Sequence, residues 1–167
     1  VDPRALMVDD ANLYAGAYAG SSILNGSFEI GAYNNWDISY WIGTLAGMTN
    51  GGSLASDSWA ARSGTNAIAI YSWDGTSNNY TTTFSQYVYP ASTGSYVFTI
   101  YIKREANALF SNAVMSIAWY DKTLTNAVQS TTVSNLNVPT DGNWLEHPVE
   151  GVPASPPASG ARRPVSC

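Results

Sequence analysis

The sequence predicts an all-β domain, an antiparallel β-sandwich of the jelly-roll type. Helical periodicity is weak along the 167 residues, whereas apolar and polar residues alternate with a period of two in many short segments. Clusters of Gly, Asn, Pro and Ser separate these segments. Short strands with no helices between them are typical of a sandwich or jelly roll, and the length fits one domain.

Most of the expected strands are short and are bounded by turn residues. The strands at 95–105 and 112–120 carry apolar residues on both faces, which is typical of the middle of a sheet. Two polar segments, 50–55 and 74–79, are predicted as loops. The expected strands are 5–14, 22–29, 36–43, 66–72, 80–89, 95–105, 112–120, 127–133, 143–149 and 162–166.

The composition favours an extracellular or cell-surface protein. Only 11% of the residues are charged, against about 25% in a typical soluble domain, and neutral polar and aromatic residues replace them. A net charge of −5 without a cluster of basic residues argues against nucleic acid. No apolar run is long enough for a membrane helix, and the single cysteine, Cys167, excludes an internal disulfide. A start without Met or a signal peptide indicates a processed product or part of a longer chain.

Four segments in order resemble one family. ILNGSFEIG at 23–31, followed by Trp36, resembles the opening strand of jelly-roll carbohydrate-binding modules of the galactose-binding-like type. SGTNAIAI at 63–70, the segment 84–105 and DGNWLEHPVEGVP at 141–153 resemble later landmarks of that family. The resemblance implies a galactose-binding-domain-like jelly roll, and it is more specific for the fold than for a ligand.

The closing strand of that family stands at the front of this chain. Family members end on a strand of the form apolar-apolar-Asp-Asp-Val-x-Leu, and the matching segment LMVDDANLY lies at 6–14. We therefore expect a displaced closing strand at 1–16, a connector at 17–22 and the jelly-roll domain at 23–167. The strand can belong to a preceding repeat, be donated to a neighbouring copy, or fill the groove of its own permuted chain. The residues expected to act in assembly are Leu6, Met7, Val8, Ala11, Leu13 and Tyr14.

Two functions are compatible with these patterns. The displaced strand favours a non-catalytic structural module, a repeat or subunit of a fibre, filament or surface assembly joined to copies of itself through its N-terminal strand. The family pattern and the aromatic content favour the alternative, a glycan-binding module that is free or appended to a polysaccharide-degrading enzyme. Expected partners are copies of the chain and, in the alternative, a polysaccharide, without nucleic acid or membrane insertion.

The resemblance also implies a structural calcium ion near the junction of the first and last strands. Calcium prefers several oxygen ligands from carboxylates and carbonyls. The residues that match the position are Glu29, Asp9, Asp10 and the carbonyls near Gly64 and Asn66. The competing interpretation is that these are ordinary polar residues at strand ends.

Glycan recognition would use aromatic rings that stack on sugars, with amides close by. The expected ligand-binding residues are Trp36, Tyr40, Trp41, Trp59, Trp73, Tyr80 and Tyr87, with Asn78, Asn79 and Gln86 as polar partners. The competing interpretation places these rings in the core or at contacts with neighbouring domains. We assign Trp119 and Trp144 to the core.

The sequence does not predict an enzyme. The only histidine, His147, lies on an expected strand without an evident nucleophile, and Glu146 and Glu150 beside it lack a glycosidase arrangement. GxSxG, HExxH and CxxC motifs do not occur. A structural role for His147 is the simpler interpretation.

Overall fold

A computed structural model of the chain describes residues 4–15, 22–30, 40–46, 52–56, 61–72, 81–88, 95–106, 108, 112–120, 125–152 and 163–166. All regular elements in these ranges are strands. They are β1 (Arg4–Ala15), β2 (Ile42–Ala46), β3 (Gly52–Ser56), β4 (Asn66–Ser72), β5 (Thr81–Val88), β6 (Tyr96–Arg104), β7 (Met115–Tyr120), β8 (Ala127–Val133), β9 (Leu145–Gly151) and β10 (Arg163–Ser166).

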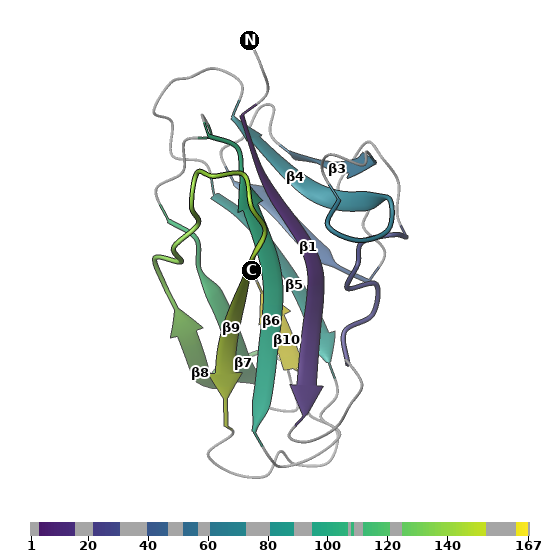
Figure 1. The fold of residues 1–167 in the computed structure, drawn as a ribbon. Coiled ribbons are helices and arrows are strands. Elements are labelled where there is room, and N and C mark those ends of the chain that lie inside the picture. The colour runs from purple at the N-terminus through teal and green to yellow at the C-terminus, as the bar shows by residue number, and fades with distance from the viewer. Residues whose placement is uncertain are drawn as a thin grey trace.

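The strands form two five-stranded sheets in which every pairing is antiparallel (Figure 1). The first sheet has the order β3-β4-β1-β6-β9 and the second has the order β2-β5-β10-β7-β8. The predicted all-β, antiparallel class is confirmed for the described residues, and the arrangement is compatible with a β-sandwich. No helix in the described ranges is both long and apolar enough to span a bilayer.

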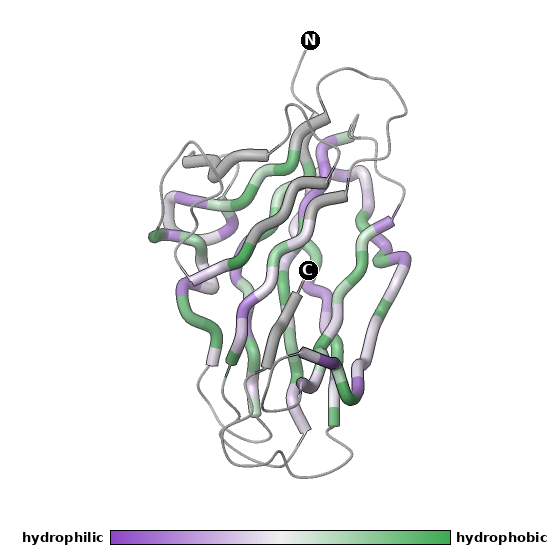
Figure 2. Tube along the Cα trace, turned by 180° about the vertical axis from the view of Figure 1, so that it is seen from behind, coloured by the Kyte–Doolittle hydropathy of each residue, from purple (hydrophilic) through white to green (hydrophobic). Residues whose placement is uncertain are grey.

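One hydrophobic core takes side chains from both sheets. Phe98 and Ile100 of β6 and Met115 and Ile117 of β7 are at most 1% exposed. Buried and half-buried residues alternate along β7, as expected for a strand with one face on a core, and apolar and polar positions alternate along the chain in Figure 2. Trp119 packs edge-on against Tyr96, with ring centroids 5.4 Å apart.

The assignment of Trp144 to the core is wrong. Trp144 is only partly buried and does not belong to the hydrophobic cluster. The ammonium group of Lys103 lies 5.4 Å from its ring centroid. The Trp144 indole therefore makes a cation–π contact with Lys103 at the periphery and does not pack in the interior.

Two predicted elements, the strand at 22–29 and the loop at 50–55, are also wrong. The expected strand at 22–29 is a turn, because Asn25 and Phe28 have positive φ angles of 51° and 55°. The Asn25 side chain both accepts from the Ile30 N–H and donates to its carbonyl, which closes the turn. The expected loop at 50–55 contains β3, since Leu54 pairs with Ile68 of β4 and this pairing overrides the polar composition.

Both terminal strands lie in the interior of a sheet. β1 lies between β4 and β6, and β10 lies between β5 and β7 (Figure 1). Along β1, Leu6 is opposite both Ile70 of β4 and Arg104 of β6. The first strand of the chain therefore completes the first sheet.

Candidate functional site

The groove that holds β1 is built from β6 on one side and from β4 and a turn on the other. β6 pairs with β1 over most of its length, but β4 pairs only with its first part, up to Val8. Beyond Val8 the turn takes over from β4: Ala11 N donates to the carbonyl of Gly26, and Ser22 N donates to the carbonyl of Leu13, both at 2.8 Å. The turn that replaces the expected strand at 22–29 thus completes the groove.

The side chains of β1 fill this groove closely. Met7 is fully buried, and Val8, Ala11 and Leu13 are at most 3% exposed. Burial of a side chain such as Leu or Met contributes about 1.5–3 kcal/mol. Of the residues expected to act in assembly, only Leu6 and Tyr14 are half-buried. The groove therefore binds β1 through its apolar side chains as well as through its backbone.

A β-bulge interrupts β1 at its two aspartates. The register with β6 shifts between Asp9 and Asn12, and Asp10 has a positive φ of 50°. Successive residues of a regular strand point to opposite faces, whereas a bulge inserts an extra residue and redirects its side chain. Here the bulge allows Asp9 and Asp10 to bind the same residue, Ser63, which no uninterrupted strand would do.

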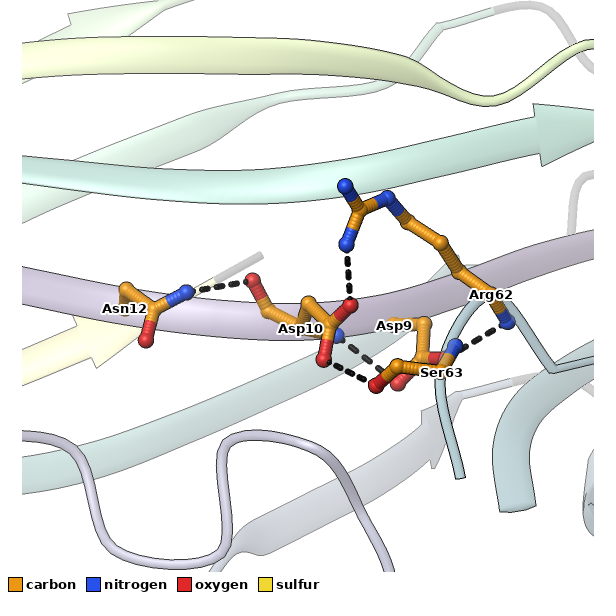
Figure 3. A network of polar contacts seen from close by, with 5 residues as sticks. All are labelled: Asp9, Asp10, Asn12, Arg62 and Ser63. Atoms are coloured by element: carbon orange, nitrogen blue, oxygen red, sulfur yellow. Dashed lines mark hydrogen bonds and ion pairs between the residues drawn. The ribbon is translucent and has the colours of Figure 1, made fainter. Parts of the chain in front are cut away.

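The two carboxylates hold the loop before β4 (Figure 3). Asp9 accepts hydrogen bonds from the backbone N–H groups of Arg62 (2.8 Å), Ser63 (3.1 Å) and Asp10 (2.8 Å). Asp10 accepts from the Ser63 hydroxyl at 2.7 Å and forms an ion pair with the Arg62 guanidinium. That guanidinium also lies 3.5 Å from the ring centroid of Tyr101 on β6. β1, β6 and the loop are thereby joined at one point.

Asp9 is fully buried, and burial shifts the pKa of its carboxyl group. Burial raises the pKa of its carboxyl from the ordinary 3.8 to about 6, although the three backbone N–H groups oppose the shift. The nearby charge of Asp10 raises it further. The buried carboxylate of Asp9 is therefore protonated at a higher pH than a carboxylate in water.

Glu29 holds the next part of the same loop. Its Oε1 accepts from the N–H groups of Thr65 and Asn66, both at 2.9 Å, and its Oε2 accepts from the Thr65 hydroxyl at 2.8 Å. Burial on its own would raise the pKa of Glu29, but these hydrogen bonds outweigh it and lower the pKa. Gly64 lies at a positive φ of 62°, where a Cβ would stand 2.3 Å from the Glu29 Oε1. We call Asp9, Asp10 and Glu29 with loop residues 62–66 the carboxylate latch.

The five residues expected to bind calcium therefore come together, but their donor set does not fit the ion. The loop directs N–H groups, rather than carbonyl oxygens, at Asp9 and Glu29, and a guanidinium occupies Asp10. Calcium requires oxygen ligands around it. The Asn66 Oδ1 is buried without a hydrogen-bond partner, yet no group of three or more acidic, His or Cys side chains within the described ranges is placed to hold a metal. The latch is closed by hydrogen bonds.

The expected glycan-binding residues that the structure describes are buried in some cases and exposed in others. Trp41 is 7% exposed, packs against Phe28 with centroids 5.2 Å apart, and donates its indole N–H to the Asn25 carbonyl. Gln86 is buried, and its amide binds both the N–H and the carbonyl of Leu24. Trp41 and Gln86 thus support the turn beside β1.

Two expected aromatic residues are on the surface. Tyr40 is 59% exposed at a φ of 75°, and Tyr87 is 38% exposed, with its ring centroid 6.1 Å from that of Tyr120. The other expected ligand-binding residues lie outside the described residues: Trp36, Trp59, Trp73, Asn78, Asn79 and Tyr80.

His147 is part of the interior. It is 6% exposed, and burial lowers the pKa of its imidazole. Glu146 and Glu150 on the same strand are exposed, at positions that alternate with the buried ones. Because His147 faces the interior and both glutamates face outward, this strand does not bring an acid–base pair together.

Comparison with protein-family models, with curated protein sequences and with solved structures found no significant match. The family resemblance singled out Gly64 and Asn66 of the latch but not Arg62, Ser63 and Thr65. The roles of Arg62 and Ser63 depend on the contact with β1, about 50 positions earlier in the chain, and that of Thr65 depends on Glu29, 36 positions earlier, so no local signal identifies them.

Proposed function

We propose that this chain is a non-catalytic structural module with a galactose-binding-like jelly-roll fold. It acts outside the cell as a subunit or repeat of a fibre, filament or surface assembly, and copies are joined through β1. The observation that carries the proposal is that the first strand of the chain lies in the interior of a sheet, between β4 and β6. The low content of charged residues supports the extracellular setting.

A strand in this position is suited to exchange between copies. An identical strand from another copy restores the same pairing with β4 and β6 and the same buried contacts. An empty groove would expose the edges of β4 and β6 and open the core beneath Val8 and Leu13. Such a groove is prone to aggregate unless it is filled. β1 fills its own groove in the isolated chain and that of a neighbour in the assembly.

A disulfide that locks β1 in its own groove tests the proposal. Tyr14 and Val97 are opposite each other in the β1–β6 register and are both half-buried. Paired antiparallel residues lie about 4.5–5.5 Å apart, within the range of a disulfide. Tyr14→Cys with Val97→Cys, in a Cys167→Ser background, closes this lock. Val97→Cys with Glu150→Cys is the matched control, because these residues link β6 to β9 and leave β1 free.

Sedimentation velocity over a range of concentrations measures the size of the species that each variant forms. The oxidised locked chain is expected to form no species larger than a dimer and to form longer assemblies after reduction, whereas the control chain forms longer assemblies in both states. The proposal is wrong if the oxidised locked chain assembles as readily as the control, or if every variant stays monomeric at all concentrations.

A glycan-binding module is the second candidate, and exposed Tyr40 favours it. A large aromatic side chain that is 59% exposed at a positive φ is costly, and such strain is concentrated at functional sites. Titration with soluble β-glucans, xylans and galactans, followed by Trp fluorescence, tests this candidate. Saturable binding that Tyr40→Ala weakens would support it. The absence of a response across the panel would count against it.

A further inference from the structure

We propose that β8 (Ala127–Val133) is a second self-association surface, at which two copies of this chain pair antiparallel and continue the second sheet across both molecules. β8 is an edge strand: it pairs with β7 on one side and ends the sheet on the other (Figure 1). An edge strand presents backbone donors and acceptors to any strand that fits beside it. This inference is independent of the exchange of β1, which concerns the first sheet.

Edge strands usually carry features that prevent such pairing, and three of the four edges in the described sheets contain proline and charged residues or are short strands with a glycine. β9 contains Pro148 between two exposed glutamates. β2 and β3 are five residues long, and each contains a glycine. Prolines, charges and short strands all weaken edge-to-edge association. β8 has the sequence AVQSTTV, seven residues without Pro, Gly or charge, and most of them are exposed.

The regular part of β8 is the segment Gln129 to Val133. Trp119 is opposite Gln129 but Tyr120 is opposite Ala127, so Val128 is the extra residue of a bulge. The bulge ends regular pairing at that point and leaves Val128 68% exposed. From Gln129 onward the strand is continuous with the ladder of β7. Five residues of β8 therefore continue the sheet regularly, and the first of them, Gln129, also donates its side-chain amide to the Val152 carbonyl at 2.7 Å.

This segment is complementary to itself. In an antiparallel pair centred on Thr131, Gln129 is opposite Val133 of the other copy, and Ser130 is opposite its Thr132. Polar β-branched and hydroxyl pairs of this kind stabilise neighbouring strands, and no like charges meet. A two-fold axis through Thr131 makes the contact closed, with the same patch on both copies.

Charge favours a second copy at this site. The chain carries a net charge of −5, so two copies repel each other at most approaches. The sequence from Thr123 to Thr140 contains no charged residue and includes all of β8. The side chains of β8 itself therefore add no charge repulsion to a contact between two copies. β8 of a second copy is also uncharged, so it can pair with β8 without an attraction between opposite charges.

A pair of charge variants tests both the surface and its register. Ser130→Lys with Thr132→Lys places lysine opposite lysine twice in the expected pair. Ser130→Lys with Thr132→Glu places opposite charges together at the same two positions. Asn137→Lys with Thr140→Lys is the control, because both residues are exposed, lie outside β8 and add the same charge.

Self-association is measured by sedimentation equilibrium in the full chain and in the oxidised Tyr14→Cys/Val97→Cys chain, where exchange of β1 is blocked. The double-lysine variant is expected to weaken dimerisation about tenfold or more, since two like-charge pairs replace two polar pairs. The Lys/Glu variant and the Asn137/Thr140 control are expected to dimerise as the parent does. Thermal melting establishes that each variant is folded.

Two results would overturn the inference. One is a locked chain that stays monomeric up to millimolar concentration. The other is an equal loss of dimerisation in the double-lysine variant and in the Asn137/Thr140 control, which would show a general charge effect. A monomeric locked chain remains compatible with the exchange of β1, which the lock itself blocks, so failure of this inference is distinguishable from failure of the proposed function.

Discussion

Gly26 lies directly against Ala11, and their backbones hold the second half of β1. The Ala11 N–H donates to the Gly26 carbonyl at 2.8 Å, and a Cβ added to Gly26 would stand 2.0 Å from the Ala11 carbonyl oxygen. The obstacle is backbone on both sides, so no rotamer change relieves it. This contact seals the groove where β4 no longer pairs with β1.

We predict that Gly26→Ala destabilises the fold by about 2 kcal/mol or more, because the added methyl group forces the turn away from β1. Urea unfolding followed by Trp fluorescence measures the change. Gly142→Ala is the control, since a Cβ there meets nothing within 4 Å. If both variants lose the same stability, the turn does not seal the groove.

The carboxylate latch gives a second prediction. Gly64 and Gly142 have similar positive φ angles, 62° and 75°, but only Gly64 faces the Glu29 carboxylate. Alanine at either position costs about 1 kcal/mol for the left-handed backbone. We expect Gly64→Ala to cost clearly more than Gly142→Ala, because the Glu29 carboxylate must move and weaken its bonds to Thr65 and Asn66. Equal unfolding free energies for the two variants would contradict the latch.

The buried carboxyl of Asp9 gives a pH dependence of stability. Its pKa is about 6 in the folded chain and near 3.8 when unfolded, so the folded state binds more protons between these values. The contribution of Asp9 to stability is therefore full below about pH 4 and is lost as the pH rises to 6. The size is about 3 kcal/mol.

Unfolding free energies measured at pH 5 and pH 7.5 test this prediction. Both values lie above the pKa of Glu29, which is lowered from 4.5, so Glu29 does not contribute to the difference. His147, whose pKa is lowered by burial, titrates in the same range with the opposite sign, so the test is the difference between the parent chain and Asp9→Asn, which share this histidine. Relative to Asp9→Asn, the parent chain is expected to gain stability at pH 5 over pH 7.5. The same change in stability between the two pH values in both chains would show that Asp9 is not a titrating group.

Removal of calcium is the fourth test. Because N–H groups and a guanidinium already bind the latch carboxylates, we expect EDTA to leave the melting temperature unchanged at neutral pH. A fall of several degrees that excess calcium reverses would establish the ion that the family resemblance implies. Glu29→Gln in the same assay would then show whether this carboxylate is a ligand.

The sequence predicted regular strands better than it predicted the groove. Period-two alternation located β4 at 66–72 and β8 at 127–133 to the residue. It failed for the turn at 22–29, where Asn25 bonds to Ile30, and for β3, which depends on pairing with β4. Local patterns record which side chains are apolar, whereas turns and bulges are fixed by contacts with distant segments.

The same distinction holds for the candidate site. The repeated aspartates and Glu29 stood out because they match the calcium position that the family resemblance implies. The bulge at Asp10, which turns both aspartates to one loop, left no local pattern. The arginine and hydroxyl partners of the carboxylates were therefore found only in three dimensions.

Supply of β1 from a second molecule tests the central claim most directly. A chain of residues 17–167 is refolded from denaturant with a synthetic peptide of residues 1–16, and native structure is followed by near-UV circular dichroism and sedimentation. A peptide with Ala11→Lys and Leu13→Lys is the control, since both side chains are buried in the groove. We predict that the shortened chain aggregates alone and folds to a one-to-one complex with the native peptide only. A shortened chain that folds to a stable monomer without the peptide would contradict the exchange of β1 between copies.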